Sequence, residues 1–115
     1  MSLKECYIKL GGDYDEVLAR LYSEDMIRRF LTKFLSDGTY HILLEKLASE
    51  DYPEAFRAAH TLKGICENLG FSNLCKSSSM LTEALRAGDY SEKLAALKEQ
   101  VCADYEQAVS AIQAL

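Results

Sequence analysis

The residues best suited to chemistry lie in one stretch, residues 56–70 (FRAAHTLKGICENLG), in which Lys63 and Gly64 follow His60 by one helical turn. A neutral imidazole is a competent nucleophile near neutral pH. A phosphoryl group on His60 would place two negative charges within reach of the Lys63 ammonium. Opposite unit charges at about 4 Å attract by roughly 4 kcal/mol at an effective dielectric near 20, before desolvation and entropy are subtracted. In the alternative, Lys63 is an ordinary surface lysine paired with Glu67 four residues later. The spacing leaves both roles of Lys63 open.

The helical periodicity of this stretch predicts that His60 points toward solvent. At about 100° per residue, the small and apolar residues form one stripe, and His60 lies about 160° from its centre. The residues that share its outward face are Phe56, Arg57, Lys63, Gly64 and Glu67. Gly64 costs on the order of 1 kcal/mol relative to alanine in a helix, and it removes every side-chain atom from the turn beside the imidazole. Phe56 is an apolar ring where a surface helix normally carries a charge. We therefore predict a cleared, partly apolar patch around an accessible His60, open to another macromolecule.

The sequence does not indicate a catalytic triad or a metal site. No serine or cysteine stands at helical spacing from His60 with a carboxylate to complete a triad. Di-iron bundles use Glu-x-x-His, but Arg57 precedes His60 by three residues and Gly38 precedes His41, which we interpret as structural. The four cysteines are widely spaced without a C-x-x-C pair, so we predict buried, reduced thiols rather than a zinc site. We expect no metal and no cofactor of the chain's own.

No nucleotide site is apparent either. The sequence lacks G-x-x-x-x-G-K-[ST] and a glycine-rich loop after a strand, and no acidic cluster could hold Mg²⁺ opposite His60. The domain could carry a phosphoryl group but could not take one from ATP unaided. Any metal and any donor or acceptor carboxylate must therefore come from a partner.

The elements that would position His60 are helices. Three segments of the form D-Y-x-E, beginning at Asp13, Asp51 and Asp89, predict capping boxes with aspartate as the N-cap. Glycines at 11–12, 38, 70 and 88 mark helix ends. The predicted helices span residues 3–10, 14–22, 24–36, 40–49, 52–69, 73–87 and 90–114. Short links favour antiparallel neighbours. We predict an all-α fold, an antiparallel four-helix bundle (24–114) with an additional N-terminal helical segment (1–22).

Length and charge restrict the class of protein further. A chain of 115 residues is expected to form a single domain, 1–115, around one core. The formal net charge of −5 gives no indication of a nucleic-acid partner. No apolar run approaches the roughly 20 residues that span a bilayer, and no signal-peptide layout is visible. We expect a monomeric cytoplasmic protein that binds neither membrane nor nucleic acid.

One stretch of the sequence is similar to the signature of a known family. Residues 59–70 (AHTLKGICENLG) resemble the H-x-x-K-G…(L)G signature of histidine-containing phosphotransfer (HPt) domains of two-component phosphorelays, and the resemblance in length and helix order covers nearly the whole chain. It implies a four-helix bundle with an extra N-terminal helix that shuttles phosphate between receiver-domain aspartates, or from a hybrid sensor histidine kinase to a response regulator. The Mg²⁺ and the aspartate belong to the receiver. Such a domain is a phosphocarrier without kinase or phosphatase activity of its own.

The resemblance assigns roles by position. His60 resembles the phosphorylation site, Lys63 the phosphate-neutralising lysine, Gly64 the clearance glycine and Gly70 the glycine that ends the helix. Glu67 departs from the pattern, since the family commonly has a small residue there. Its carboxylate could orient the imidazole, pair with Lys63 or repel an acidic receiver surface. The dimerisation helix of sensor kinases is a poorer match, because its histidine is followed by an acidic residue and, soon after, by a proline.

The same resemblance predicts a docking patch for the receiver. We expect the receiver to dock around Phe56, Arg57 and His60 and to touch the helix 24–36, where Met26 and Phe30 would flank the patch. The alternative is a helical adaptor that binds a receiver or kinase through the face of Phe56 and His60 without being phosphorylated.

Overall fold

The computed structural model describes residues 1–115, and its secondary structure is entirely helical. The helices are α1 (Leu3–Leu10), α2 (Tyr14–Leu21), α3 (Glu24–Ser36), α4 (Thr39–Ala48), α5 (Tyr52–Leu69), α6 (Ser72–Arg86) and α7 (Glu92–Gln113). Each predicted helix is present, with ends that differ by at most two residues. The all-α prediction is confirmed. No helix combines the length and the apolar character that crossing a membrane requires.

Two of the three predicted aspartate caps are present. The Asp13 and Asp51 carboxylates accept backbone hydrogen bonds from Glu16 (3.0 Å) and Glu54 (3.3 Å) at the starts of α2 and α5. The third prediction is wrong, because Ser91 is the N-cap of α7.

Asp89 instead stabilises the link before α7. Its carboxylate accepts a hydrogen bond of 2.6 Å from the Ser91 hydroxyl, and that serine in turn caps the backbone of Lys93. The helix therefore begins at Glu92, two residues later than the D-Y-x-E pattern predicts. A capping box that the aspartate pattern did not include joins Ser2 and Glu5 at the start of α1.

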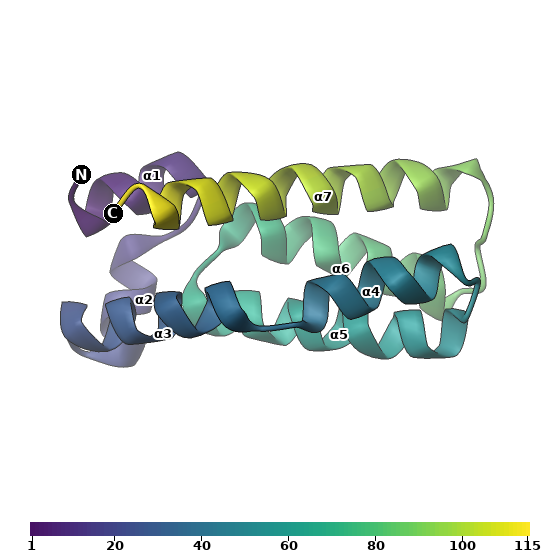
Figure 1. Cartoon of the computed structure of the whole chain (residues 1–115), viewed down its shortest axis with the longest axis horizontal. Helices are drawn as coiled ribbons and strands as arrows, with labels where there is room; N and C mark the ends of the chain where they lie inside the picture. Colours follow the sequence, from purple (N-terminus) through teal and green to yellow (C-terminus); the bar gives the residue numbers. More distant parts are fainter.

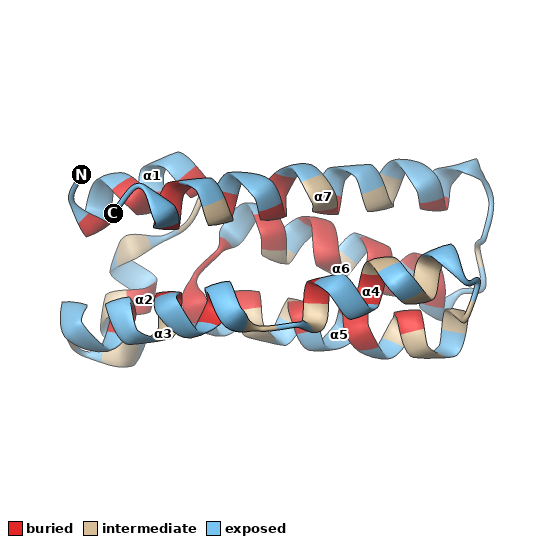
Figure 2. Cartoon of the chain, viewed as in Figure 1, coloured by how far each residue is buried: buried red, intermediate tan, exposed pale blue.

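The helices α5, α6 and α7 run antiparallel to one another in succession, as Figure 1 shows. The helix α4, with α3 nearly in line before it, packs along α5. Buried residues line the inner sides of the helices (Figure 2). Stacked rings of Tyr40 and Tyr105, with centroids 3.6 Å apart, join α4 to α7. Phe34 and Phe71, with centroids 5.1 Å apart, join α3 to the α5–α6 turn.

The N-terminal helices close one end of this arrangement. The helix α1 packs beside the C-terminal part of α7. The Asp13 N–H donates to the Gly70 carbonyl (2.8 Å), and the Asn73 N–H donates to the Gly11 carbonyl (3.0 Å). A Cβ on Gly12 would lie 2.6 Å from the Gly70 carbonyl oxygen, so this close approach of two backbones requires glycine. The N-terminal segment is thus joined through the backbone to the turn that ends α5.

Candidate functional site

His60 lies in the middle of α5, and its side chain is exposed. The helix turns its stripe of small and apolar residues into the core, namely Ala55, Ala58, Ala59, Leu62, Cys66 and Leu69. The outward orientation predicted for His60 is confirmed. No hydrogen bond within the chain engages the imidazole, so both ring nitrogens are available to a partner.

Gly64 leaves open space beside the histidine. A Cβ added at this position would meet no heavy atom within 4 Å outside its own helix backbone. Packing within the chain therefore does not require glycine here, in contrast to Gly12. The missing side chain opens onto a shallow hollow whose rim includes Thr61, Asn68 and Arg20.

Phe56 is half-buried and packs against the core, so its ring is less displayed than the sequence predicts. The ring edge meets the His60 imidazole nearly at a right angle (89°), with centroids 6.0 Å apart. The Arg86 guanidinium lies over the ring, 4.8 Å from its centroid. Aromatic faces attract cations in this geometry. Phe56 thus contacts both the imidazole and a cation of α6.

Sequence reasoning missed Arg86, although a signal was available. The helices α5 and α6 form an antiparallel hairpin around the turn at Gly70–Phe71, so residues equidistant from Phe71 face each other. Phe56 and Arg86 are such a pair.

Lys63 extends along α5 toward Glu67 rather than toward the imidazole. Its Nζ lies 3.8 Å from the Glu67 Oε1, and its side chain is 28% exposed. Both residues line a groove between α5 and α6 that also contains Cys75. Of the two roles that the spacing left open, the unphosphorylated structure shows the ion pair. Glu67 makes no hydrogen bond to the imidazole, so an orienting role for it gains no support.

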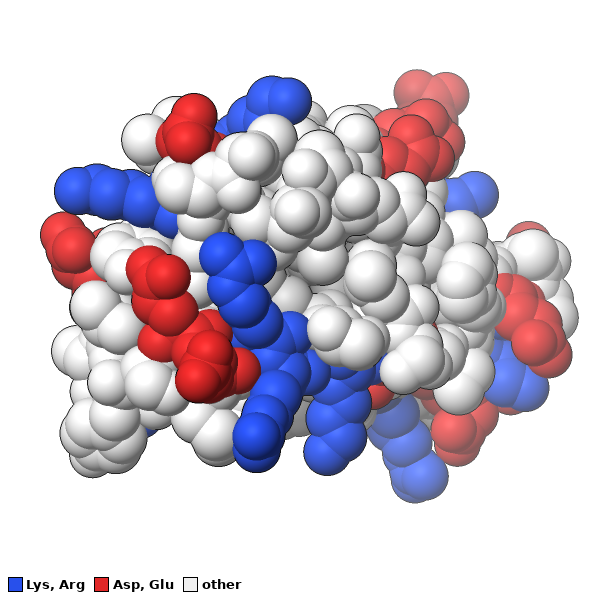
Figure 3. All heavy atoms as spheres, turned by 60° about the vertical axis from the view of Figure 1, so that its left-hand side comes forward, with Lys and Arg blue, Asp and Glu red and all other residues white.

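The ion pairs of the molecule are concentrated around this helical hairpin. Each joins an arginine or lysine to a glutamate three or four residues away on the same helix: Arg20–Glu16 (2.9 Å), Arg57–Glu54 (3.4 Å), Lys63–Glu67 (3.8 Å) and Arg86–Glu83 (3.3 Å). Charges also cluster elsewhere: Figure 3, turned to bring the α1–α3 end forward, shows a band of lysine and arginine beside acidic groups. On α5 and α6, the cations Arg57, Lys63 and Arg86 are each paired with a glutamate of the same helix.

The predicted docking residues do not form one continuous patch. Phe56 and Arg57 lie beside His60, but Phe30 lies in a hollow with Ile65 and the last turn of α5. Met26 is 38% exposed and lies a further turn toward the start of α3. Because α3 runs antiparallel to α5 (Figure 1), the first turn of α3, which contains Met26, lies toward the C-terminal end of α5, whereas Phe56 is near the start of α5. A contact of Met26 or Phe30 with a partner stays a prediction.

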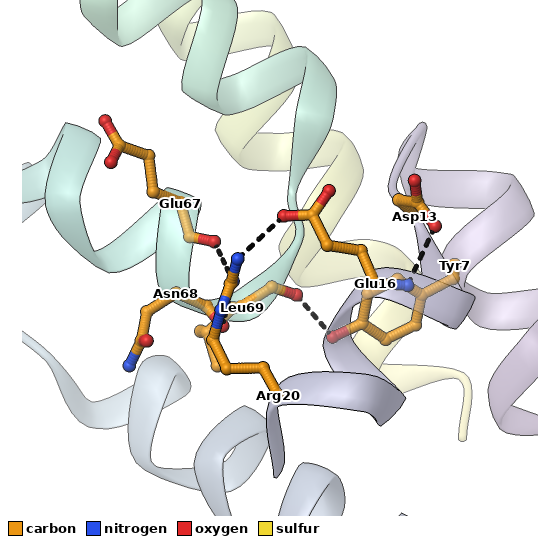
Figure 4. Close-up of polar contacts among 7 residues, drawn as sticks. All are labelled: Tyr7, Asp13, Glu16, Arg20, Glu67, Asn68 and Leu69. Carbon is orange, nitrogen blue, oxygen red and sulfur yellow. Dashed lines mark hydrogen bonds and ion pairs between the residues drawn. The ribbon is translucent and has the colours of Figure 1, made fainter. Parts of the chain in front are cut away.

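The C-terminal end of α5 is completed by side chains from the N-terminal segment (Figure 4). The last turn of α5 contains no basic residue. Arg20 reaches over from α2 and donates to the carbonyls of Glu67 and Asn68, the latter at 3.0 Å. The buried Tyr7 hydroxyl donates to the Leu69 carbonyl at 2.7 Å. A cation at this position interacts favourably with the helix dipole. No sequence signal indicated either contact.

The four cysteines are free, and two of them differ from the prediction of burial. Cys6 and Cys66 are buried, whereas Cys75 and Cys102 are half-buried. Burial raises the pKa of the Cys66 thiol, with a smaller contribution from neighbouring Cys75. No group of three or more histidine, cysteine, aspartate or glutamate side chains is arranged to hold a metal ion.

These features define a class: a helical domain that presents a histidine, His60, to solvent on the flank of an antiparallel hairpin. A family model described as "Hpt domain" matches residues 26–115, most of the chain. The chain therefore belongs to the Hpt domain family, which confirms the resemblance found in the sequence, and membership implies a phosphotransfer role in two-component signalling. Comparisons with curated proteins and with solved structures give no significant match. The helices α1 and α2 precede the matched residues.

Proposed function

We propose that the chain is a phosphorelay intermediate that accepts a phosphoryl group on His60 and passes it to a receiver domain. The donor is an aspartyl phosphate of another receiver domain or of a hybrid sensor histidine kinase. The observation that carries the proposal is the unengaged, exposed imidazole beside the open space at Gly64, in a chain that belongs to the Hpt family.

The transfer requires little of this chain beyond a placed nucleophile. The lone pair of one imidazole nitrogen attacks phosphorus, and the phosphorus–oxygen bond of the aspartyl phosphate breaks. The aspartate leaves as a carboxylate with the bonding electrons, and His60 gains a nitrogen–phosphorus bond. The other ring nitrogen keeps its proton until it is released to water. The return step reverses these bonds toward a second aspartate.

Lys63 and Arg86 are the cations we propose for the phosphoryl group. Lys63 is one turn from His60, and Arg86 is held over Phe56, whose ring contacts the imidazole. The chain has no donor set for Mg²⁺, so in this proposal the ion that neutralises the phosphoryl group during transfer is held by the receiver's carboxylates.

The proposed partner surface centres on Phe56, Arg57 and His60, with Phe30 and Met26 at a distance along α3. A receiver must bring its aspartate against the α5 flank, where Gly64 offers clearance. We further propose that the chain acts as a monomer in the cytoplasm, where its four free thiols would remain reduced.

The test is transfer of labelled phosphate from a receiver domain charged with acetyl phosphate. Wild-type protein should acquire label that is labile in acid and stable in alkali, the behaviour of phosphohistidine. His60→Gln should acquire none. His41→Gln is the matched control, since His41 is the other histidine and is exposed on α4; it should transfer like wild type.

Two outcomes would contradict the proposal. Label on the His60→Gln variant would assign the site elsewhere. Receiver binding that His60→Gln leaves unchanged, with no label on wild type, would instead support a phosphorylation-independent adaptor.

A further inference from the structure

Glu67 is the residue of the site that the proposed function does not use. It lies two turns after His60 on the same flank of α5, and its side chain is 54% exposed. Its only polar side-chain contact is the pair with Lys63, at 3.8 Å between Nζ and Oε1. An exposed pair at this distance contributes little to folding. The carboxylate therefore has a larger effect on where the Lys63 ammonium lies than on stability.

The groove between α5 and α6 shows in which direction the Lys63–Glu67 pair points. Lys63 and Glu67 both line it, together with Cys75 across on α6. The pKa of the Cys75 thiol responds to both charges: after burial, Glu67 raises it and Lys63 lowers it. The distance of 3.8 Å to Glu67 places the ammonium on the C-terminal side of Lys63, in the groove that α6 also lines.

We propose that Glu67 is a positioning residue that acts through Lys63 and limits how long His60 retains a phosphoryl group. This inference rests on the proposed function. In the unphosphorylated protein the carboxylate holds the ammonium away from the imidazole. After phosphorylation, the phosphoryl group and Glu67 compete for the same cation. His60 therefore passes its phosphoryl group on more readily than it would without Glu67.

The other ion pairs follow the same arrangement. Arg57 on α5 and Arg86, which lies over the Phe56 ring, are paired with Glu54 and Glu83 on their own helices. A phosphoryl group on His60 meets no unpaired cation at these positions and must draw each one from a carboxylate. Lys63 and Arg57 are each three residues from His60, and the pair of Lys63 is the longer of the two. Glu67 is therefore the carboxylate whose removal should matter most.

The experiment measures the equilibrium between a labelled receiver and the chain, and the lifetime of the phosphohistidine. Glu67→Gln should shift the equilibrium toward His60 about two- to five-fold, which corresponds to about 0.4–1 kcal/mol, and should lengthen the lifetime. Glu99→Gln removes the same charge from an exposed, unpaired position on α7 and should change neither quantity. In about 1 M salt, where the Debye length falls to roughly 3 Å, the effect of Glu67→Gln should shrink.

A double-mutant comparison tests the route through Lys63. In the Lys63→Ala background, Glu67→Gln should produce less than half of its shift in wild type. An undiminished shift would mean that Glu67 acts by charge alone, and equal equilibria for wild type and Glu67→Gln would overturn the inference altogether. In both cases wild type still carries phosphate, so the proposed function survives. If wild type takes up no label at all, the proposed function fails first.

Discussion

Replacing Gly64 with alanine should make the protein more stable and a poorer phosphate carrier. Glycine inside a helix costs about 0.5–1 kcal/mol relative to alanine, because the unfolded chain loses more conformational freedom. The added methyl group meets no atom within 4 Å outside the backbone of α5, so packing removes none of this gain. We expect the free energy of unfolding to rise by about 0.5–1 kcal/mol. For a domain of this size the melting temperature should rise by about 2–5 °C.

The unfavourable effect of the added methyl group should appear in phosphate transfer, when a partner docks, and not in folding. The methyl group projects into the space beside the exposed imidazole, where the receiver must bring its aspartyl phosphate to bonding distance. A misplacement of about 1 Å in such a reaction can cost on the order of 100-fold in rate. We expect Gly64→Ala to slow transfer moderately and Gly64→Leu to abolish it, although both variants fold.

Stability is measured by urea and thermal unfolding followed by circular dichroism, and transfer by the label assay described above. Gly38→Ala is the control for transfer, because it also adds a methyl group into open space, at the start of α4. It should leave the transfer rate unchanged. Gly64→Leu that transfers as fast as wild type would refute the steric argument. Gly64→Ala that unfolds more easily than wild type would show that the glycine serves the fold instead.

Three further predictions concern the contacts around α5. Arg20→Ala should lower the free energy of unfolding by about 1–2 kcal/mol, because two carbonyls at the end of α5 lose a charged donor; Arg28→Ala, on an exposed position without an ion pair, should not. Tyr7→Phe should lower the free energy of unfolding by a similar amount, because it leaves the buried Leu69 carbonyl unpaired; urea unfolding at neutral pH measures this. Burial raises the pKa of Tyr7 above its ordinary value of about 10, so wild-type stability should fall as pH rises above about 10, where the unfolded chain ionises and the folded one does not; an equal fall in Tyr7→Phe would contradict this. Arg86→Ala should slow phosphate transfer about two- to five-fold with a small change in unfolding, and an unchanged rate would exclude Arg86 from the site.

The orientation of His60 could be predicted because it depends only on local spacing. Once α5 is a helix, the positions of Ala55, Leu62 and Cys66 determine which flank faces the core. Gly64 stood out for the same reason, since its cost is a property of any helix interior. These predictions needed no knowledge of the neighbouring helices.

The contacts of the site with other elements were not predictable to the same degree. Arg86 reaches Phe56 across a hairpin, and only the register around the turn at Gly70 brings them together. Arg20 comes from a segment whose place against α5 no local pattern specifies. The position of Met26 relative to Phe56 was not predictable for a related reason: periodicity predicts the face of a helix but not its level along the neighbouring helix.

The start of α7 shows a competition that a pattern cannot resolve. Asp89 and Ser91 are both good N-cap residues. The D-Y-x-E pattern favoured the aspartate, but the serine hydroxyl can donate to the Asp89 carboxylate while its oxygen accepts from Lys93. Using both residues in series satisfies more polar groups than the predicted cap does.

The N-terminal segment explains how α5 can contain a glycine in its middle and still end cleanly. Helix ends leave carbonyls without partners, and a helix weakened at Gly64 would fray most readily in the turns that follow. Tyr7 and Arg20 donate hydrogen bonds to these last carbonyls from outside the helix, and the Asp13 N–H donates to the carbonyl of Gly70, which caps it. At about 0.5–1.5 kcal/mol net for each bond, they offset the cost of the glycine. The clearance beside His60 and the helices that precede the Hpt-matched residues therefore have opposite effects on α5: the first weakens it where the proposed function brings a partner, and the second stabilises its C-terminal end.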